Sequence, residues 1–157
     1  MEKITSFTID HIRLQPGLYV SRKDRVGEET VTTFDLRVTK PNEEPVINTA
    51  EMHTIEHLAA TYLRNEANWK DRVIYFGPMG CRTGFYLLVR DAEPDTVLRV
   101  VMDTLEKIVN HDGEMFGATR KECGNYRELD LALAKKEAAA YLAELRLREH
   151  DFIYPTK

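Results

Sequence analysis

Four short segments of strand character occur as two neighbouring pairs, and this order restricts the fold more than any other feature of the sequence. Residues 17–25 and 31–39 flank the polar turn VGEE, and the apolar runs at 73–76 and 85–89 flank the turn GPMGCRTG. Short segments bounded by glycine favour strands over helices. Strands that follow one another through a short turn pair as antiparallel neighbours, so we predict a mostly antiparallel sheet.

Three helix-like segments come after the first pair of strands. The first begins near Asn48, which can cap it, and Glu51 completes a capping-box-like pair; its apolar stripe consists of Ile55, Ala59, Tyr62 and Leu63. The other two are expected at 94–111, with proline in the first turn, and at about 130–148, which is rich in Ala, Leu, Lys and Glu. No repeat or linker interrupts the 157 residues. We therefore predict an α+β fold in one domain, 1–157, with helices covering the sheet.

The second strand segment predicts one buried face and one polar face. Phe34, Leu36 and Val38 alternate with Asp35 and Arg37, which is the period-2 pattern of a half-buried strand. Spacing alone leaves Arg37 as an exposed arginine paired with a nearby acid, an interaction worth under about 1 kcal/mol. A guanidinium also presents a rigid fork of donors to a carboxylate or to sugar hydroxyls, so a ligand-orienting role stays open.

Charge and hydropathy argue against several kinds of partner. The formal net charge of −4 at pH 7 gives no clustered basic surface for nucleic acid, and no apolar run approaches the roughly 20 residues that cross a membrane. The sequence MEKITSFTIDHIRLQPG lacks the apolar core and cleavage site of a signal peptide. We therefore expect a cytoplasmic protein, in which Cys81 and Cys123 serve catalysis or metal binding rather than a disulfide.

The stretch HTIEHL places two histidines and a glutamate on the first expected helix. His53 and His57 are four positions apart and therefore share a face, with Glu56 beside them. Two imidazoles at this spacing can hold one divalent metal ion, while the carboxylate remains free to move protons. The alternative is that the histidines cap a surface or satisfy a hydrogen bond in the core.

A catalytic metal centre needs three protein ligands and one open position. Cys123, in RKECGNY, is a soft candidate for the third ligand, although a buried structural thiol fits the same sequence. Cys81 lies in the turn GPMGCRTG beside Arg82, and a neighbouring guanidinium or metal stabilises a thiolate, which can serve as an acid or base. A small residue tolerated in a turn is the alternative for Cys81.

Five sequence blocks follow one another between Ser6 and Cys123: SFTIDH, FDLR, HTIEHL, GPMGCRTGFY and ECG. Together they closely resemble the S-ribosylhomocysteine lyase (LuxS) family, and the chain length fits as well. The resemblance implies a metal-dependent enzyme, typically with ferrous iron, and with zinc or cobalt as alternatives in a purified sample. It implies cleavage of the thioether of S-ribosylhomocysteine to homocysteine and 4,5-dihydroxy-2,3-pentanedione, the precursor of a quorum-sensing autoinducer. It also implies a homodimer with active sites at the subunit interface.

The resemblance assigns roles residue by residue. His53, His57 and Cys123 would bind the metal, and Glu56 and Cys81 would transfer protons. The residues that would contact the small-molecule substrate are Ser6, Phe7, His11, Arg37 and Tyr86. For Arg37, the match to FDLR favours the ligand-orienting role over the exposed ion pair.

The implied reaction moves a sugar carbonyl from C1 to C2 to C3 and then eliminates the thiol from the β position. Each migration removes a proton next to a carbonyl, a task suited to two groups that titrate near the working pH. One departure concerns the strand before PMGC, where several family members have an acidic residue and a serine. This chain has Tyr75 and Gly77 instead, which leaves open how the homocysteine end is held.

Three other interpretations also fit the residues. HxxEH is the inverted motif of zinc metallopeptidases, although these are longer and take a glutamate as the third ligand. A structural metal-binding module would hold the ion only to brace the fold, and it would need a fourth protein ligand. A non-catalytic binding protein that keeps the fold is the third interpretation.

Overall fold

The computed structural model describes residues 1–155, and the fold is α+β, as predicted. The strands in this part of the chain form one antiparallel sheet in the order β1-β2-β4-β3. Their bounds are Gly17–Val26 (β1), Glu29–Arg37 (β2), Val73–Pro78 (β3) and Gly84–Arg90 (β4). The helices are α1 (Thr49–Asn65), α2 (Pro94–Val109) and α3 (Leu131–Leu147), with the short 3-10 helices η1 (Thr5–Phe7) and η2 (Tyr126–Glu128).

Both predicted hairpins form, and the strand order joins them through their second strands. β1 pairs with β2 and β3 pairs with β4, in each case antiparallel. β2 also pairs antiparallel with β4, and in this register Arg37 lies opposite Gly84. In the sequence, 46 residues lie between these two positions. This long-range pairing puts β2 and β4 in the middle of the sheet.

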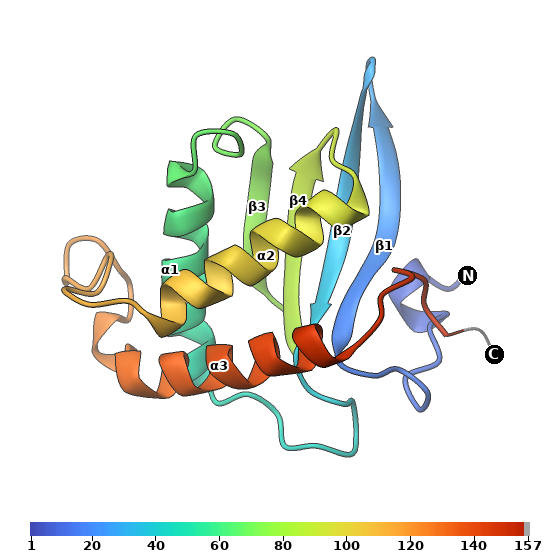
Figure 1. Ribbon diagram of the computed structural model, residues 1–157. Helices are drawn as coiled ribbons and strands as arrows, with labels where there is room; N and C mark the ends of the chain where they lie inside the picture. Colours follow the sequence, from blue (N-terminus) through green and yellow to red (C-terminus); the bar gives the residue numbers. More distant parts are fainter. Residues whose placement is uncertain (156–157) are drawn as a thin grey trace.

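The α-helices lie on one face of the sheet (Figure 1). α1 lies beside β3, while α2 and α3 cross in front of the strands and pack on each other. Phe34 and Leu36 of β2 and Leu87 of β4 belong to the apolar core that the sheet shares with these helices. Among residues 1–155, no helix combines the length and the apolar character needed to cross a membrane.

Helix α1 begins where the sequence predicts. Asn48 is the N-cap residue, and its backbone N–H donates to Glu51 Oε2 at 3.1 Å, which is one half of the predicted capping box. Ile55, Ala59 and Leu63 of the predicted apolar stripe are buried. The helix is therefore fixed both at its start and along the side that faces the core.

The polar side of β2 is not exposed, which corrects the expectation of one buried and one polar face. Asp35 is 0% exposed and Arg37 is 2% exposed. The helices cover the side of the strand that carries Phe34, and the C-terminal segment covers part of the other side, where Tyr154 reaches Asp35. An alternation pattern shows which residues share a face, but it does not show that a distant segment covers the polar one.

Gly84 allows β4 to approach β2 very closely. It is paired with Arg37 across the two strands, and a Cβ at this position would lie 2.1 Å from the backbone oxygen of Leu36. The clash would be with main chain in the middle of the sheet, where no flexible side chain can move aside. Any larger residue would therefore push the strands apart beside the turn that carries Cys81.

We expect Gly84→Ala to lower the free energy of unfolding by about 2 kcal/mol or more, because overpacking of a tight site typically costs ~1–3 kcal/mol. Gly80→Ala is the matched control in the same hairpin, since an added Cβ there has no atom within 4 Å. Its effect should stay within about 1 kcal/mol. Urea unfolding followed by circular dichroism measures both. Equal losses in the two variants would contradict the close approach.

Candidate active site

His53, His57 and Cys123 bring three metal-ligating atoms to one point. His53 Nε2 and His57 Nε2 are 3.1 Å apart, and Cys123 Sγ is 3.4 Å from His53 Nε2. All three ligand atoms lie within 4.8 Å of one another. The histidines share a face of α1 because they are about one helical turn apart, and Cys123 comes from the loop between α2 and η2.

The spacing of these atoms fits a divalent metal ion. In a tetrahedral centre, usual bond lengths to nitrogen and sulfur place two nitrogen ligands about 3.3 Å apart and nitrogen and sulfur about 3.6 Å apart. The observed separations of 3.1 and 3.4 Å are close to these values. Within residues 1–155 the group has three members, so a fourth position is left for water or substrate.

Polar contacts on the far side of the rings hold the histidines in a ligand orientation. His57 Nδ1 donates to the backbone oxygen of Phe116 at 2.8 Å, which leaves Nε2 free to bind a metal. His53 Nδ1 lies 3.5 Å from Glu128 Oε2. Sequence reasoning missed Phe116 and Glu128. The one local signal is Gly117, which has a φ of 65° and passes so close to His57 that an added Cβ would lie 3.0 Å from Nδ1.

Glu56 lies on the same side of α1 as the two histidines. Ile55 and Ala59 are buried in the core, and the helical period therefore turns His53, Glu56 and His57 toward the outer side of the helix. The Glu56 carboxylate makes no hydrogen bond or ion pair with any residue of the described range 1–155. The Glu56 carboxylate therefore lies unengaged on the face of α1 that carries the two histidines.

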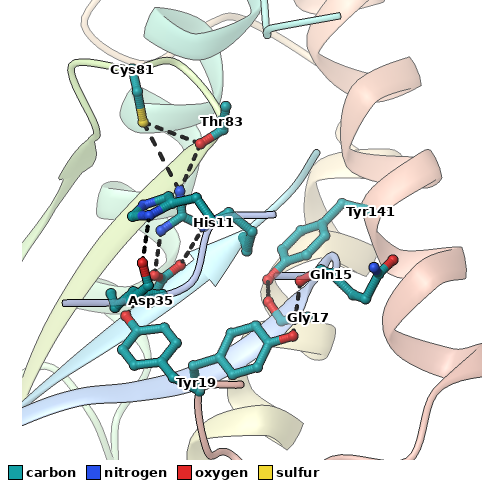
Figure 2. Close-up of polar contacts among 11 residues, drawn as sticks. His11, Gln15, Gly17, Tyr19, Asp35, Cys81, Thr83 and Tyr141 are labelled. Carbon is teal, nitrogen blue, oxygen red and sulfur yellow. Dashed lines mark hydrogen bonds and ion pairs between the residues drawn. The ribbon is translucent and has the colours of Figure 1, made fainter. Parts of the chain in front are cut away.

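Cys81 is exposed in the turn between β3 and β4. Thr83 Oγ1 is 3.1 Å from its sulfur, and Arg37 Nη1 lies 4.0 Å from the sulfur and donates to Thr83 Oγ1 at 2.7 Å (Figure 2). The guanidinium at Cys81 thus belongs to Arg37, whereas the sequence pointed to its neighbour Arg82. The difference arises because the β2–β4 register, which no local pattern reveals, brings Arg37 to the turn.

A buried carboxylate holds the guanidinium of Arg37. Arg37 Nε donates to Asp35 Oδ1 at 3.1 Å, and Nη2 donates to Asp35 Oδ2 at 2.5 Å, so the pair is bidentate. Burial acts to lower the pKa of Arg37, but the Asp35 carboxylate outweighs burial and raises the pKa above its usual value. The arginine is therefore a permanent cation. Sequence reasoning placed the two residues on one side of the strand but missed their burial.

The other predicted substrate residues lie around this ion pair or on the N-terminal segment. Tyr86 stands opposite Asp35 in the β2–β4 register, and burial, followed by the Asp35 charge, raises the pKa of Tyr86. Figure 2 draws His11 between Cys81 and Asp35 in that view. Ser6 and Phe7 belong to η1, which packs on β1. Of these residues, Phe7 is the most open, with 68% of its surface exposed.

The candidate metal ligands face a different part of the surface from the Cys81 group, by which we mean Cys81, Thr83, Arg37 and Asp35. Arg37 alternates with Leu36, which faces the helices, so Arg37 points to the sheet face that the helices leave open. His53 and His57 lie on the outer side of α1, away from the core. No hydrogen bond or ion pair joins the two groups within residues 1–155. One copy of the chain therefore presents two separate groups of candidate site residues.

Comparisons with known proteins cover nearly the whole chain. Residues 4–151 match the family model described as S-Ribosylhomocysteinase (LuxS). The chain is 51% identical to the S-ribosylhomocysteine lyase of Phocaeicola vulgatus, over 100% of this chain and 99% of that protein. It is 52% identical to the protein of the same name from Finegoldia magna, over 99% of each chain. The corresponding protein of Borreliella burgdorferi is 50% identical, over 99% of this chain and 100% of its own length.

We expect Cys123→Ala to weaken metal binding by at least about 10-fold, because it removes one of three converging ligand atoms, and even the loss of an outer hydrogen bond costs ~10-fold or more. Metal content per chain after dialysis, measured by mass spectrometry, tests this. Cys81→Ala is the matched control, since it removes the other cysteine of the chain and should keep the metal. Full metal content in Cys123→Ala would contradict the assignment.

Proposed function

The chain belongs to the S-ribosylhomocysteine lyase (LuxS) family, and we propose that it cleaves the thioether of S-ribosylhomocysteine to homocysteine and 4,5-dihydroxy-2,3-pentanedione. One observation carries this proposal. The family match contains a three-ligand centre, formed by His53, His57 and Cys123, that can hold a metal with an open position. Glu56 and Cys81 lie outside the ligand set, so they are available to move protons.

A divalent ion held by His53, His57 and Cys123 would supply Lewis-acid stabilisation of the sugar oxygens as the carbonyl migrates. We propose ferrous iron as this ion; two imidazoles and one thiolate also suit zinc and cobalt. The contacts of His57 with Phe116 and of His53 with Glu128 keep both rings turned toward the ion.

Glu56 and Cys81 are the proposed proton-transfer residues. Each carbonyl migration takes a proton from one carbon and returns one to its neighbour, and the final elimination takes a proton from the carbon next to the last carbonyl. Glu56 has no structural partner within residues 1–155 that it would have to leave. The Cys81 sulfur is exposed and lies 4.0 Å from the Arg37 guanidinium, so it can reach a substrate from a fixed position.

Substrate contact is proposed for Arg37, Ser6, Phe7, His11 and Tyr86. Arg37 suits this role because its Nε and Nη2 are engaged by Asp35, whereas Nη1 points toward the Cys81 turn. Tyr75 and Gly77, where the chain departs from several family members, form a linked pair. A Cβ at Gly77 would lie 2.0 Å from the Tyr75 hydroxyl, so the phenol occupies the space of a side chain at position 77.

A homodimer would unite the candidate metal ligands and the Cys81 group as two half-sites of one active site. A two-fold axis can place the Cys81 group of one copy against the metal ligands of the other, and the reciprocal contact then forms as well. Exposed apolar side chains support such a contact, since Phe7, Ile12 and Tyr75 are 68%, 79% and 51% exposed. A contact that removes such apolar surface from water is favourable. We therefore propose that each active site is built from both subunits.

The other interpretations of the sequence find less support. The family match and the full-length relatives favour the lyase over a zinc metallopeptidase. A structural metal module would need a fourth protein ligand, and the group found within residues 1–155 has three. A cytoplasmic location and the use of the product as an autoinducer precursor stay predictions.

The metal-loaded protein should release free thiol from S-ribosylhomocysteine, which a thiol-reactive dye measures. Glu56→Gln should keep its metal while turnover falls at least about 100-fold, because a general acid–base group contributes ~10²–10⁴-fold. Absence of thiol release by the fully metal-loaded wild-type protein would refute the proposed function. Loss of metal from Glu56→Gln would instead make this residue a ligand.

Mixed dimers test whether the site is shared between subunits. Cys81→Ala and Cys123→Ala each disable one half-site, so the separate variants should be inactive. In a random mixture, about half of the dimers contain both variants, and one of their two sites has intact halves; about one quarter of the wild-type activity should return. Co-expression of the two variants without selection of the mixed dimers, followed by thiol release, measures this. An inactive mixture would show that each chain builds its own site.

A further inference from the structure

The C-terminal segment after α3 reaches the ion pair on the open face of the sheet. The backbone N–H of Val20 in β1 donates to the Phe152 oxygen at 2.9 Å, which adds this segment to the sheet. The Tyr154 ring then stacks on the Tyr19 ring, with centroids 5.3 Å apart. The Tyr154 hydroxyl donates to Asp35 Oδ2 at 2.6 Å. A residue three positions from the end of the sequence thus contacts the carboxylate that holds Arg37.

The contacts of Asp35 leave the Arg37 guanidinium little freedom. Asp35 is completely buried, and its two oxygens receive donors from Arg37 Nε, Arg37 Nη2 and the Tyr154 hydroxyl. The guanidinium is planar, so once two of its nitrogens are fixed the third has one direction. That direction leads to Thr83 Oγ1, at 2.7 Å, and the sulfur of Cys81 lies 3.1 Å beyond it.

The hydroxyl of Tyr154 is suited to act as a permanent hydrogen-bond donor to Asp35. Burial, and then the negative charge of Asp35, raise the pKa of Tyr154 far above its usual value. The phenol therefore stays protonated at neutral pH and keeps its hydrogen for Asp35. Without this hydroxyl, Asp35 Oδ2 would lose one of its two donors inside a buried site, and the carboxylate could turn with the guanidinium that it holds.

We propose that Tyr154 is a positioning residue, which holds Asp35 so that Arg37 and Thr83 in turn hold the sulfur of Cys81. The chain of contacts runs from the C-terminal segment through β2 to the β3–β4 turn, and each link is a direct hydrogen bond or ion pair. The consequence for turnover rests on the proposed lyase function. The consequence for the reactivity of Cys81 does not.

The test is Tyr154→Phe, which keeps the ring stacked on Tyr19 and removes only the hydroxyl. Tyr19→Phe is the matched control: it removes the hydroxyl of the other stacked ring, which donates to the Gln15 backbone oxygen at 2.9 Å and not to Asp35. Both are examined as metal-loaded full-length protein. Iodoacetamide alkylates Cys81, and mass spectrometry of the Cys81 peptide gives its rate constant; thiol release gives kcat/KM, and thermal unfolding reports stability.

We expect Tyr154→Phe to slow alkylation of Cys81 and to lower kcat/KM by about 5- to 10-fold each. An Arg37 guanidinium that turns with Asp35 leaves the attacking sulfur without its neighbouring cation, and small misplacements of groups in an active site cost up to ~100-fold in turnover. Tyr19→Phe should stay within about 2-fold of the wild type in both, since its hydroxyl is outside the contact chain. Alkylation of Tyr154→Phe at the wild-type rate would overturn the proposal, whatever happens to its melting temperature. An equal loss in Tyr19→Phe would also overturn it. If no protein releases thiol, the proposed function fails, and the alkylation rates still decide the role of Tyr154.

Discussion

The buried ion pair of Asp35 and Arg37 governs how the open face of this sheet is built. A charge at this depth is tolerated only when it is paired and fully hydrogen-bonded, because removing one partner typically costs ~3–5 kcal/mol. Here the pair needs a central strand to carry it, a glycine at position 84 to bring β4 close, and a tyrosine from the C-terminal segment to complete the carboxylate. The same requirements direct the Arg37 guanidinium toward the Cys81 turn. The contacts that stabilise this face of the sheet therefore also position the sulfur that we propose to act in proton transfer.

Helix α1 has two different sides: one packs in the core, and the other carries two histidines of a group that can hold a metal. Burial of Ile55 and Ala59 sets the rotation of the helix, and this rotation turns His53 and His57 outward together. The long loop from α2 to η2 then adds Cys123 and the Phe116 carbonyl. The group that can hold a metal is therefore fixed by the packing of a helix, whereas the group around Cys81 is fixed by a buried ion pair.

Local patterns in the sequence were enough to predict the main helices and strands and the placement of two histidines on one face of α1. Asn48 and Glu51 mark the start of α1, and the spacing of His53 and His57 depends only on the helical period. Contacts between distant segments were beyond such patterns. The encounter of Arg37 with Cys81 depends on the β2–β4 register. For the same reason, alternation along β2 predicted an exposed polar face, because it contains no information about the segment that ends near Tyr154. For Cys123, the residue type suggested a ligand, and the fold was needed to bring it to the histidines.

We propose that a metal centre on α1 and the thiol beside Arg37 belong to one active site formed by two copies of the chain. Anomalous diffraction from a crystal of the metal-loaded protein, recorded at the absorption edge of the metal, tests it most directly. One peak is predicted among His53, His57 and Cys123, with Cys81 of the partner subunit across the same cavity. A peak at other residues, or a metal centre with solvent where the partner's Cys81 should be, would contradict the claim.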